Sequence, residues 1–161
     1  MQKRIQKSTG IPFLILNVDR NNIVQETFNQ LTRVAKEDLK KPLKVFFKNE
    51  EALDDGGVTK ELFQLITREV FKVEYGLFSF NREMGVYWFN PNSLEGSIQY
   101  ELIGITLALG IYNKVILGIK FPSILYKKLL GRKHVIEDVR DINPQLYEGF
   151  KQLLEVTTFF F

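Results

Sequence analysis

The sequence predicts an α+β fold that is mainly helical and that carries short strands and a hairpin. Apolar residues recur at helical spacing in several segments, most clearly over residues 58–70. Short runs of strand-forming residues at 11–18 and 43–47 predict two strands. Two aromatic runs, at 75–80 and 86–89, enclose a stretch with turn chemistry, which predicts a β-hairpin.

The composition is that of an ordinary folded domain. The chain has 161 residues, of which 45% are hydrophobic and 13% aromatic, enough for one domain with a sizeable core. The formal net charge of +3 is mild and does not require a nucleic-acid or membrane partner. We therefore expect no nucleic-acid partner, and the lysine clusters are typical of a solvated surface.

Two residue counts limit the chemistry of this chain. It has no cysteine, which excludes disulfides, thiolate metal sites and thiol nucleophiles within it. With His134 as its single histidine, a histidine-rich metal site is also excluded, and we expect neither a metal nor a cofactor. Residues 1–10 contain no apolar run, so we expect no secretory signal and an intracellular, cytoplasmic location, with the nucleus also open.

The first elements follow from local pattern. Residues 1–10 form a basic lead-in, and the strand at 11–18 comes next. Apolar residues at mainly helical spacing predict an amphipathic helix over 22–36. Pro42 ends any helix before it, and the strand at 43–47 follows.

Residues 53–71 combine a tight polar turn with a half-buried helix. The turn consists of Asp54, Asp55, Gly56 and Gly57. Glycine pairs supply positive φ angles at little steric cost, and acidic side chains favour the positive N-terminal end of a helix. Apolar residues then recur at helical spacing, so the segment predicts a strand-to-helix corner.

The most apolar long segment is residues 98–117. Its uninterrupted part, residues 102–112, is too short for a bilayer span, which needs ~20 residues. We therefore expect no membrane span and predict a central helix that is apolar nearly all round. Gly104 and Gly110 are expected to permit close packing there.

Two further helices complete the chain. Pro122 precedes a helix over 123–130, and Gly131 suits the position just after its end. Pro144 begins the last helix, which runs to about residue 154.

The acidic glycine turn could in principle bind a ligand. A calcium loop needs further oxygen ligands at fixed spacing and a final bidentate glutamate, and residues 53–61 lack that alternation. A phosphate loop needs a glycine-rich pattern ending in Gly-Lys-Ser or Gly-Lys-Thr, which residues 57–60 do not provide. The structural corner is the favoured interpretation.

Other residues could in principle carry chemistry. Glu50, Glu51, Asp54 and Asp55 could supply paired carboxylates for glycoside hydrolysis, but a solvated acidic loop is favoured. No Ser-His-Asp pattern surrounds His134, so a surface histidine is favoured over a general base.

The aromatic residues of the hairpin could stack nucleic-acid bases, but no alternating Arg or Lys accompanies them and core packing is favoured. The aromatic residues in question are Phe78, Phe80, Tyr87, Trp88 and Phe89.

We predict no catalytic residue in this chain.

Taken in order, several segments resemble the first part of a HECT domain, the catalytic module of one class of ubiquitin ligases. The resemblance covers about residues 11–155, and the sequence is most similar to the small HERC and E6-associated-protein groups of that family. The ordered set is more specific than any single segment. The matching segments are residues 41–47, 53–63, 75–78, 88–91, 102–105, 111–113, 121–122, 126–131 and 146–155.

The resemblance implies the large subdomain of the N-terminal lobe of that module. In the intact family, ubiquitin passes from a ubiquitin-conjugating enzyme to a cysteine of the C-terminal lobe, as a thioester, and then to a lysine of a protein substrate. The implied partners are therefore the conjugating enzyme, ubiquitin and the substrate. What the resemblance carries over to this chain is scaffold: the Asp54–Gly57 corner, the central helix, and the segment Trp88, Phe89, Asn90 and Pro91.

The chain departs from the family because it has no cysteine and cannot form the thioester. We expect a truncated N-terminal lobe that is inactive alone, with residues 1–10 as lead-in, 11–155 as a partial HECT domain, and 156–161 as an apolar tail outside the resemblance. The alternatives are a non-catalytic module that binds ubiquitin or another partner, and a defective isoform.

Overall fold

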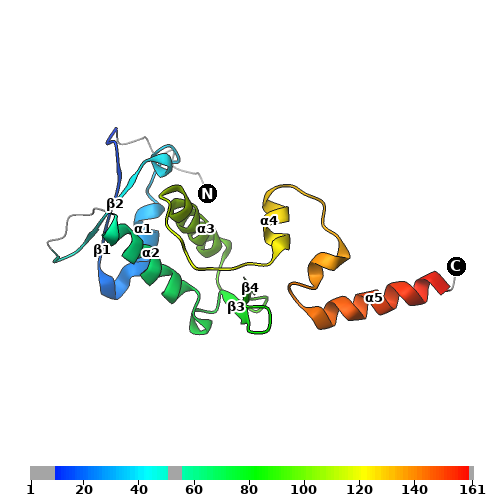
Figure 1. The fold of residues 1–161 in the computed structure, drawn as a ribbon. Helices are drawn as coiled ribbons and strands as arrows, with labels where there is room; N and C mark the ends of the chain where they lie inside the picture. The colour runs from blue at the N-terminus through cyan, green and yellow to red at the C-terminus, as the bar shows by residue number, and fades with distance from the viewer. Residues whose placement is uncertain (1–9, 51–55, 160–161) are drawn as a thin grey trace. The chain divides into compact units, whose positions relative to one another are not determined.

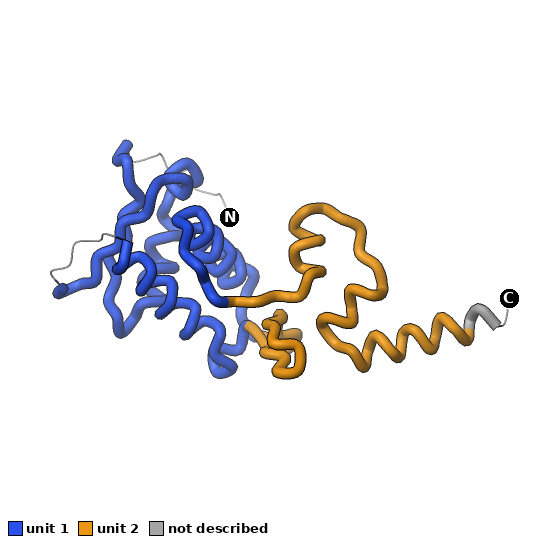
Figure 2. Tube along the Cα trace, in the orientation of Figure 1, with its two compact units in different colours: residues 1–77, 94–118 blue, residues 78–93, 119–161 orange. Residues whose placement is uncertain are grey.

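A computed structural model of the protein describes residues 10–50 and 56–159, with side chains as far as residue 156. Helices make up far more of it than strands, which form two 2-stranded sheets, so the predicted α+β, mainly helical class is confirmed. Figure 2 shows two compact units, residues 1–77 with 94–118 and residues 78–93 with 119–161. The expected divisions after residues 10 and 155 stay a prediction.

The first unit begins with a strand, a helix and a second strand. β1 (Leu14–Val18) and β2 (Leu43–Phe47) pair in parallel, and α1 (Ile23–Leu31) lies between them in the chain. Strand β2 has the predicted bounds. The predicted helix over 22–36 is too long: α1 ends at Leu31, and i to i−3 turn bonds follow, from the N–H of Arg33 to Gln30 at 3.0 Å and from the N–H of Val34 to Leu31 at 3.2 Å.

Short turns and two more helices complete this unit. The 3-10 turns are η1 (Arg20–Asn22), η2 (Asp38–Lys40) and η3 (Val73–Tyr75), and the helices are α2 (Gly57–Val70) and α3 (Ser97–Tyr112). Helix α1 packs on β1, α2 and α3, and α2 also packs on β2 (Figure 1). The core is built from side chains at most 2% exposed, among them Leu16, Val18, Val45, Leu62, Phe63 and Val70.

The central helix α3 is apolar on all sides but buried on only part of its surface. Ile98 and Ile111 are 61% and 70% exposed. A Cβ at Gly110 would lie 2.7 Å from Leu117, which confirms the expected close packing, whereas a Cβ at Gly104 would meet nothing within 4 Å, so that expectation is wrong. In the part of the chain that the structure describes, no helix has both the length and the apolarity to cross a membrane.

The second unit contains the predicted hairpin and the C-terminal helices. The hairpin strands are β3 (Phe78–Asn81) and β4 (Val86–Phe89), which pair antiparallel. At the turn, the carboxamide oxygen of Asn81 accepts the N–H of Met84 at 3.1 Å. Beyond the hairpin come α4 (Ser123–Leu129), η4 (Ile136–Val139) and α5 (Pro144–Phe159).

The predicted end of α4 and the predicted start of α5 are confirmed, whereas the predicted end of the last helix at about residue 154 is wrong, because α5 continues to Phe159. Gly131 has φ +64°, and the N–H of Arg132 donates to the carbonyl of Lys127 at 2.9 Å, which closes the end of α4. Helix α5 begins at Pro144, and the side chain of Asn143 accepts the N–H of the third helical residue at 3.0 Å.

Candidate functional site

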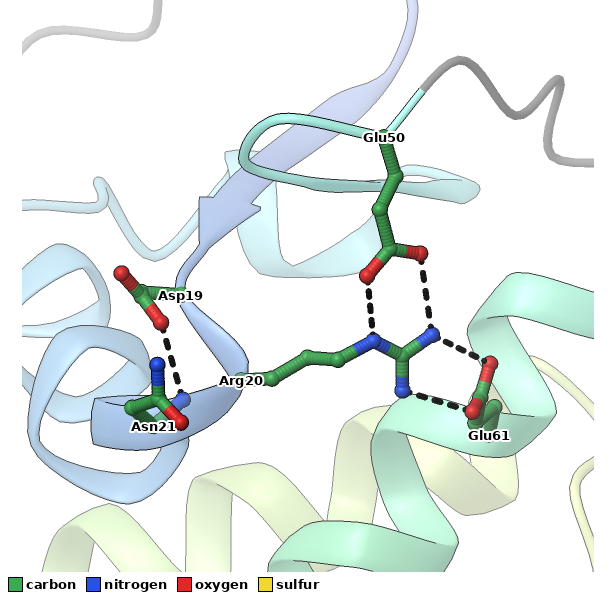
Figure 3. A network of polar contacts seen from close by, with 5 residues as sticks. All are labelled: Asp19, Arg20, Asn21, Glu50 and Glu61. Atoms are coloured by element: carbon green, nitrogen blue, oxygen red, sulfur yellow. Dashed lines mark hydrogen bonds and ion pairs between the residues drawn. The ribbon is translucent and has the colours of Figure 1, made fainter.

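The best-defined cluster of charged side chains in the first unit is centred on Arg20. The residue lies directly after β1, in η1, where the carboxylate of Asp19 accepts the N–H of Asn21 at 2.8 Å and caps the turn. The turn directs the guanidinium away from Asp19 and toward Glu50 and Glu61 (Figure 3).

The guanidinium of Arg20 binds two carboxylates at once. Toward Glu50 it donates from Nε and from Nη2, the latter at 3.0 Å. Toward Glu61, on the second turn of α2, it donates from Nη1 at 2.6 Å and from Nη2 at 3.0 Å. The same group lies 3.9 Å from the centre of the Phe47 ring. Such two-pronged pairs fix geometry more strictly than single contacts do.

We call Arg20, Glu50 and Glu61 the Arg20 clamp. Glu50 follows β2 and Glu61 belongs to α2, so the clamp joins the chain before the acidic glycine turn to the helix after it. Its three side chains are 37%, 37% and 45% exposed. Solvent screens charges at such exposure, so the clamp contributes to local geometry more than to overall stability.

Hydrogen bonding within the clamp sets the protonation of its members. The bonds from Arg20 lower the pKa of both Glu50 and Glu61, and the two carboxylates raise the pKa of Arg20. A general acid needs a raised carboxyl pKa, so neither glutamate has the property required of the acid in glycoside hydrolysis.

A second ion pair extends the charged network onto α1. Glu26 accepts from Lys48 at 2.7 Å and from the N–H of Asp19 at 2.8 Å. Both bonds lower the pKa of the Glu26 carboxyl, with the lysine as the larger cause. The network therefore ties β1, α1 and the end of β2 together.

The structure places half of the predicted corner. Gly56 has φ +92° at the N-cap of α2, as expected of a turn glycine, whereas Gly57 has no positive φ and is the first residue of the helix. Asp54 and Asp55 lie outside the described residues. Their proposed role at the helix N-terminus stays a prediction.

The other predicted scaffold segment lies in the second unit. Trp88 and Phe89 end β4, and the carboxamide oxygen of Asn90 accepts the N–H of Asn92 at 3.0 Å, which makes a turn that includes Pro91. The two predicted segments therefore belong to different units, and each is described within its own.

Phe89 belongs to an aromatic cluster in that unit. Its ring centre lies 5.5 Å from that of Phe78 and 6.5 Å from that of Phe121, and Phe80 packs against Tyr87 at 4.7 Å. The segment before α4 reaches the hairpin, since the N–H of Tyr87 donates to the carbonyl of Lys120 at 2.8 Å. Phe80 and Phe89 remain 43% and 37% exposed, so the cluster combines packing with an open face.

Over residues 10–50 and 56–159, no three His, Asp or Glu side chains converge as metal ligands. His134 is exposed, as expected of a surface histidine. The charged side chains described above connect loops and helices of the first unit to one another.

Comparison with known proteins indicates one family. Residues 64–159 match the family described as the HECT-domain (ubiquitin-transferase). The chain is 42% identical over 144 residues to the probable E3 ubiquitin-protein ligase HERC3 of Homo sapiens, and 42% over 144 residues to HERC4 of Rattus norvegicus. It is 34% identical over 168 residues to the probable E3 ubiquitin-protein ligase HECTD2 of Mus musculus.

These matches cover 89%, 89% and 96% of the chain. They cover only 14%, 14% and 22% of the relatives, so the chain spans a small part of their length. The chain belongs to the HECT-domain family. The resemblance stated from the sequence is thereby confirmed.

Sequence reasoning missed the Arg20 clamp. The sequence pattern singles out Glu50 only as one of a group of acidic residues, and it does not single out Arg20. The contact joins residues 30 and 41 positions apart in the chain, and no local pattern encodes such a separation.

Proposed function

We propose that this chain forms part of the N-lobe scaffold of a HECT-type E3 ubiquitin-protein ligase. The observation that carries the proposal is the 42% identity over 89% of the chain to a protein named as a probable E3 ubiquitin-protein ligase. The implied partners are a ubiquitin-conjugating enzyme, ubiquitin and a protein substrate. A cytoplasmic setting, with the nucleus also open, is part of the proposal.

The chain's own contribution is positional. A thiolate is a good nucleophile toward the ubiquitin thioester, but these 161 residues contain no cysteine. The thiolate must therefore come from outside them. The charged clamp and the aromatic hairpin would hold the scaffold in shape while the reaction takes place elsewhere in the ligase.

A charging assay tests whether this chain can itself accept ubiquitin as a thioester. The chain is incubated with ubiquitin, activating enzyme, a charged conjugating enzyme and ATP, and is then run on gels with and without thiol reductant. We expect no adduct that the reductant removes. A reducible ubiquitin adduct on this chain would contradict the proposal.

A chimera tests whether the chain can serve as the scaffold of an intact ligase. The 144 residues aligned with human HERC3 are grafted into that protein in place of its own segment, and autoubiquitylation is measured. We expect substantial activity to remain. The control is the same chimera with its thioester cysteine replaced by alanine, which must be inactive. A folded but inactive chimera would show that these residues do not serve as this scaffold.

A second candidate function is non-covalent binding of ubiquitin or another partner. The observation that favours it is the open aromatic face with Phe80 and Phe89. Titration of isotopically labelled chain with ubiquitin, followed by NMR, would show shifts confined to the hairpin. The absence of shifts at millimolar ubiquitin would remove this candidate.

A further inference from the structure

The two faces of the β1–β2 sheet differ sharply. Side chains alternate between the faces along each strand. The inward set is buried and consists of Leu14, Leu16, Val18, Leu43, Val45 and Phe47. On the outward face, Ile15 is 46% exposed, Phe46 is 38% exposed and Phe13, just before β1, is 36% exposed. We call Phe13, Ile15, Lys44 and Phe46 the outward sheet face.

An uncovered face is unusual for parallel strands. Parallel sheets occur almost only where both faces are covered, because the crossover helices pack on them. Here α1 and α2 pack on the strands from the inward side. The register places Ile15 beside Lys44 and Asn17 beside Phe46, so the exposed side chains form one continuous surface.

This surface is positively charged as well as apolar. The ammonium group of Lys44 lies 4.5 Å from the centre of the Phe13 ring. Within residues 10–50 and 56–156, Lys44 has no carboxylate within ion-pair distance, whereas Lys48, just past the other end of β2, is paired with Glu26 at 2.7 Å. The unpaired cation lies in the middle of the apolar patch.

We propose that the outward sheet face docks an amphipathic helix that carries carboxylates beside its apolar stripe. Two strands about 5 Å apart match the ~10 Å width of one helix. Strands of five residues span about 17 Å, which corresponds to roughly three helical turns. The apolar stripe covers Ile15 and Phe46, and a carboxylate at its edge pairs with Lys44.

Charge complementarity selects this occupant over a second copy of the chain. Two outward sheet faces packed together would bring two unpaired Lys44 cations into one apolar interface, and burying like charges is costly. A helix with glutamates beside its stripe supplies the missing carboxylate.

The probe is a synthetic helical peptide of about fourteen residues with leucines at i, i+3, i+7 and i+10 and glutamates beside them. Its control has lysine at every glutamate position. Binding to the labelled chain is followed by NMR and fluorescence anisotropy. We expect only the acidic peptide to bind, with shifts centred on Phe13, Ile15 and Phe46.

Variants locate the site and test its charge. Ile15→Asp is expected to weaken binding by about tenfold or more, because it puts a like charge into the apolar contact. Val73→Asp is the matched control, since Val73 is 71% exposed in the same unit but lies outside the sheet. Lys44→Glu is the decisive variant, because it should lose the acidic peptide and gain the basic one. Circular dichroism confirms that each variant is folded.

Several outcomes would overturn the proposal. Equal binding of both peptides, or no binding at millimolar peptide, removes it. A dimer in analytical ultracentrifugation that Ile15→Asp abolishes would assign the face to a second copy. Binding to phosphatidylserine vesicles that depends on Ile15, without binding to the acidic peptide, would assign it to a membrane surface.

Discussion

The side-chain amide of Gln30 pairs with the backbone of Asn17 as a neighbouring strand would. Its carbonyl oxygen accepts the N–H of Asn17 at 3.1 Å, and its NH₂ group donates to the Asn17 carbonyl at 2.8 Å. Asn17 is in β1 and Gln30 is in α1. The helix thus closes part of the outer edge of a strand, which limits pairing with other chains.

Replacing Gln30 should therefore destabilise the first unit. Gln30→Ala removes both hydrogen bonds, and we expect a loss of about 1–2 kcal/mol in the free energy of unfolding. Gln30→Glu keeps the acceptor but loses the donor, so its loss should be smaller. Urea unfolding followed by far-ultraviolet circular dichroism measures this, because the single tryptophan, Trp88, lies in the other unit.

The control for this prediction is Gln25→Ala. Among the described residues, the side chain of Gln25 bonds Asn29 of the same helix, at 3.1 Å, and its loss should change stability by less than about 0.5 kcal/mol. Equal effects of the two alanine variants would show that the edge contact is unimportant.

Two adjacent glycines give opposite expectations. Gly56 has φ +92°, a conformation that costs an L-residue about 1–2 kcal/mol, so Gly56→Ala should destabilise. Gly57 is helical, and nothing lies within 4 Å of a Cβ there, so Gly57→Ala should be neutral or stabilise by up to about 1 kcal/mol. Thermal and urea unfolding of the pair distinguish backbone strain from steric crowding, and a loss in both variants would contradict this explanation.

Local sequence pattern predicted most of the elements. The run of strand-forming residues Leu43–Phe47 predicted a strand with the observed bounds. Gly131 marked the end of α4 because glycine adopts the left-handed conformation of a helix C-terminus without strain. Helix α1 ends at Leu31, earlier than the apolar spacing predicts, so spacing alone does not define the end of this helix.

The site could be predicted less well than the fold. The turn conformation of Gly56 follows from local sequence, whereas Gly57 was predicted in the turn and is helical. The Arg20 clamp and the pairing of Gln30 with Asn17 depend on which segments meet in space, and polar residues at these positions have many acceptable partners. Family resemblance predicted scaffold segments but gave no contacts between them.

Asn113 provides a long-range contact of the same kind. Its carboxamide oxygen accepts the N–H of Leu43 at 2.9 Å, and its NH₂ group donates to the carbonyl of Leu109 at 2.9 Å. The residue caps α3 and holds the start of β2. Asn113→Leu leaves a partly buried N–H without its partner, so we expect a loss of about 1–3 kcal/mol in urea unfolding.

Asn113→Asp serves as the comparison. A carboxylate still accepts from Leu43 but cannot donate to Leu109, so its loss should lie between wild type and Asn113→Leu. Amide exchange of Leu43 provides a direct readout, because protection should fall in the leucine variant and persist in the aspartate variant. Unchanged protection in the leucine variant would refute the cap.

The Arg20 clamp should make stability depend on pH in the acid range. The folded-state pKa values of Glu50 and Glu61 are lowered by hydrogen bonds from Arg20, whereas a glutamate in the unfolded chain titrates near ~4.3. The unfolded state therefore binds protons first as pH falls. The clamp's contribution to folding stability is complete above the pKa of glutamate in the unfolded chain. It is lost as the pH falls through the lower folded-state pKa values of Glu50 and Glu61.

Arg20→Gln tests this by removing the cation. We expect the variant to be less stable than wild type at pH 7, with the difference shrinking below about pH 4 and in high salt. Arg20→Lys should retain only part of the effect, because an ammonium cannot make the two-pronged contacts of a guanidinium. Urea unfolding by circular dichroism at pH 7, 5 and 3 provides the measurement. A difference between wild type and Arg20→Gln that stays constant from pH 7 to pH 3 would show that the clamp acts through packing on Phe47 and not through charge.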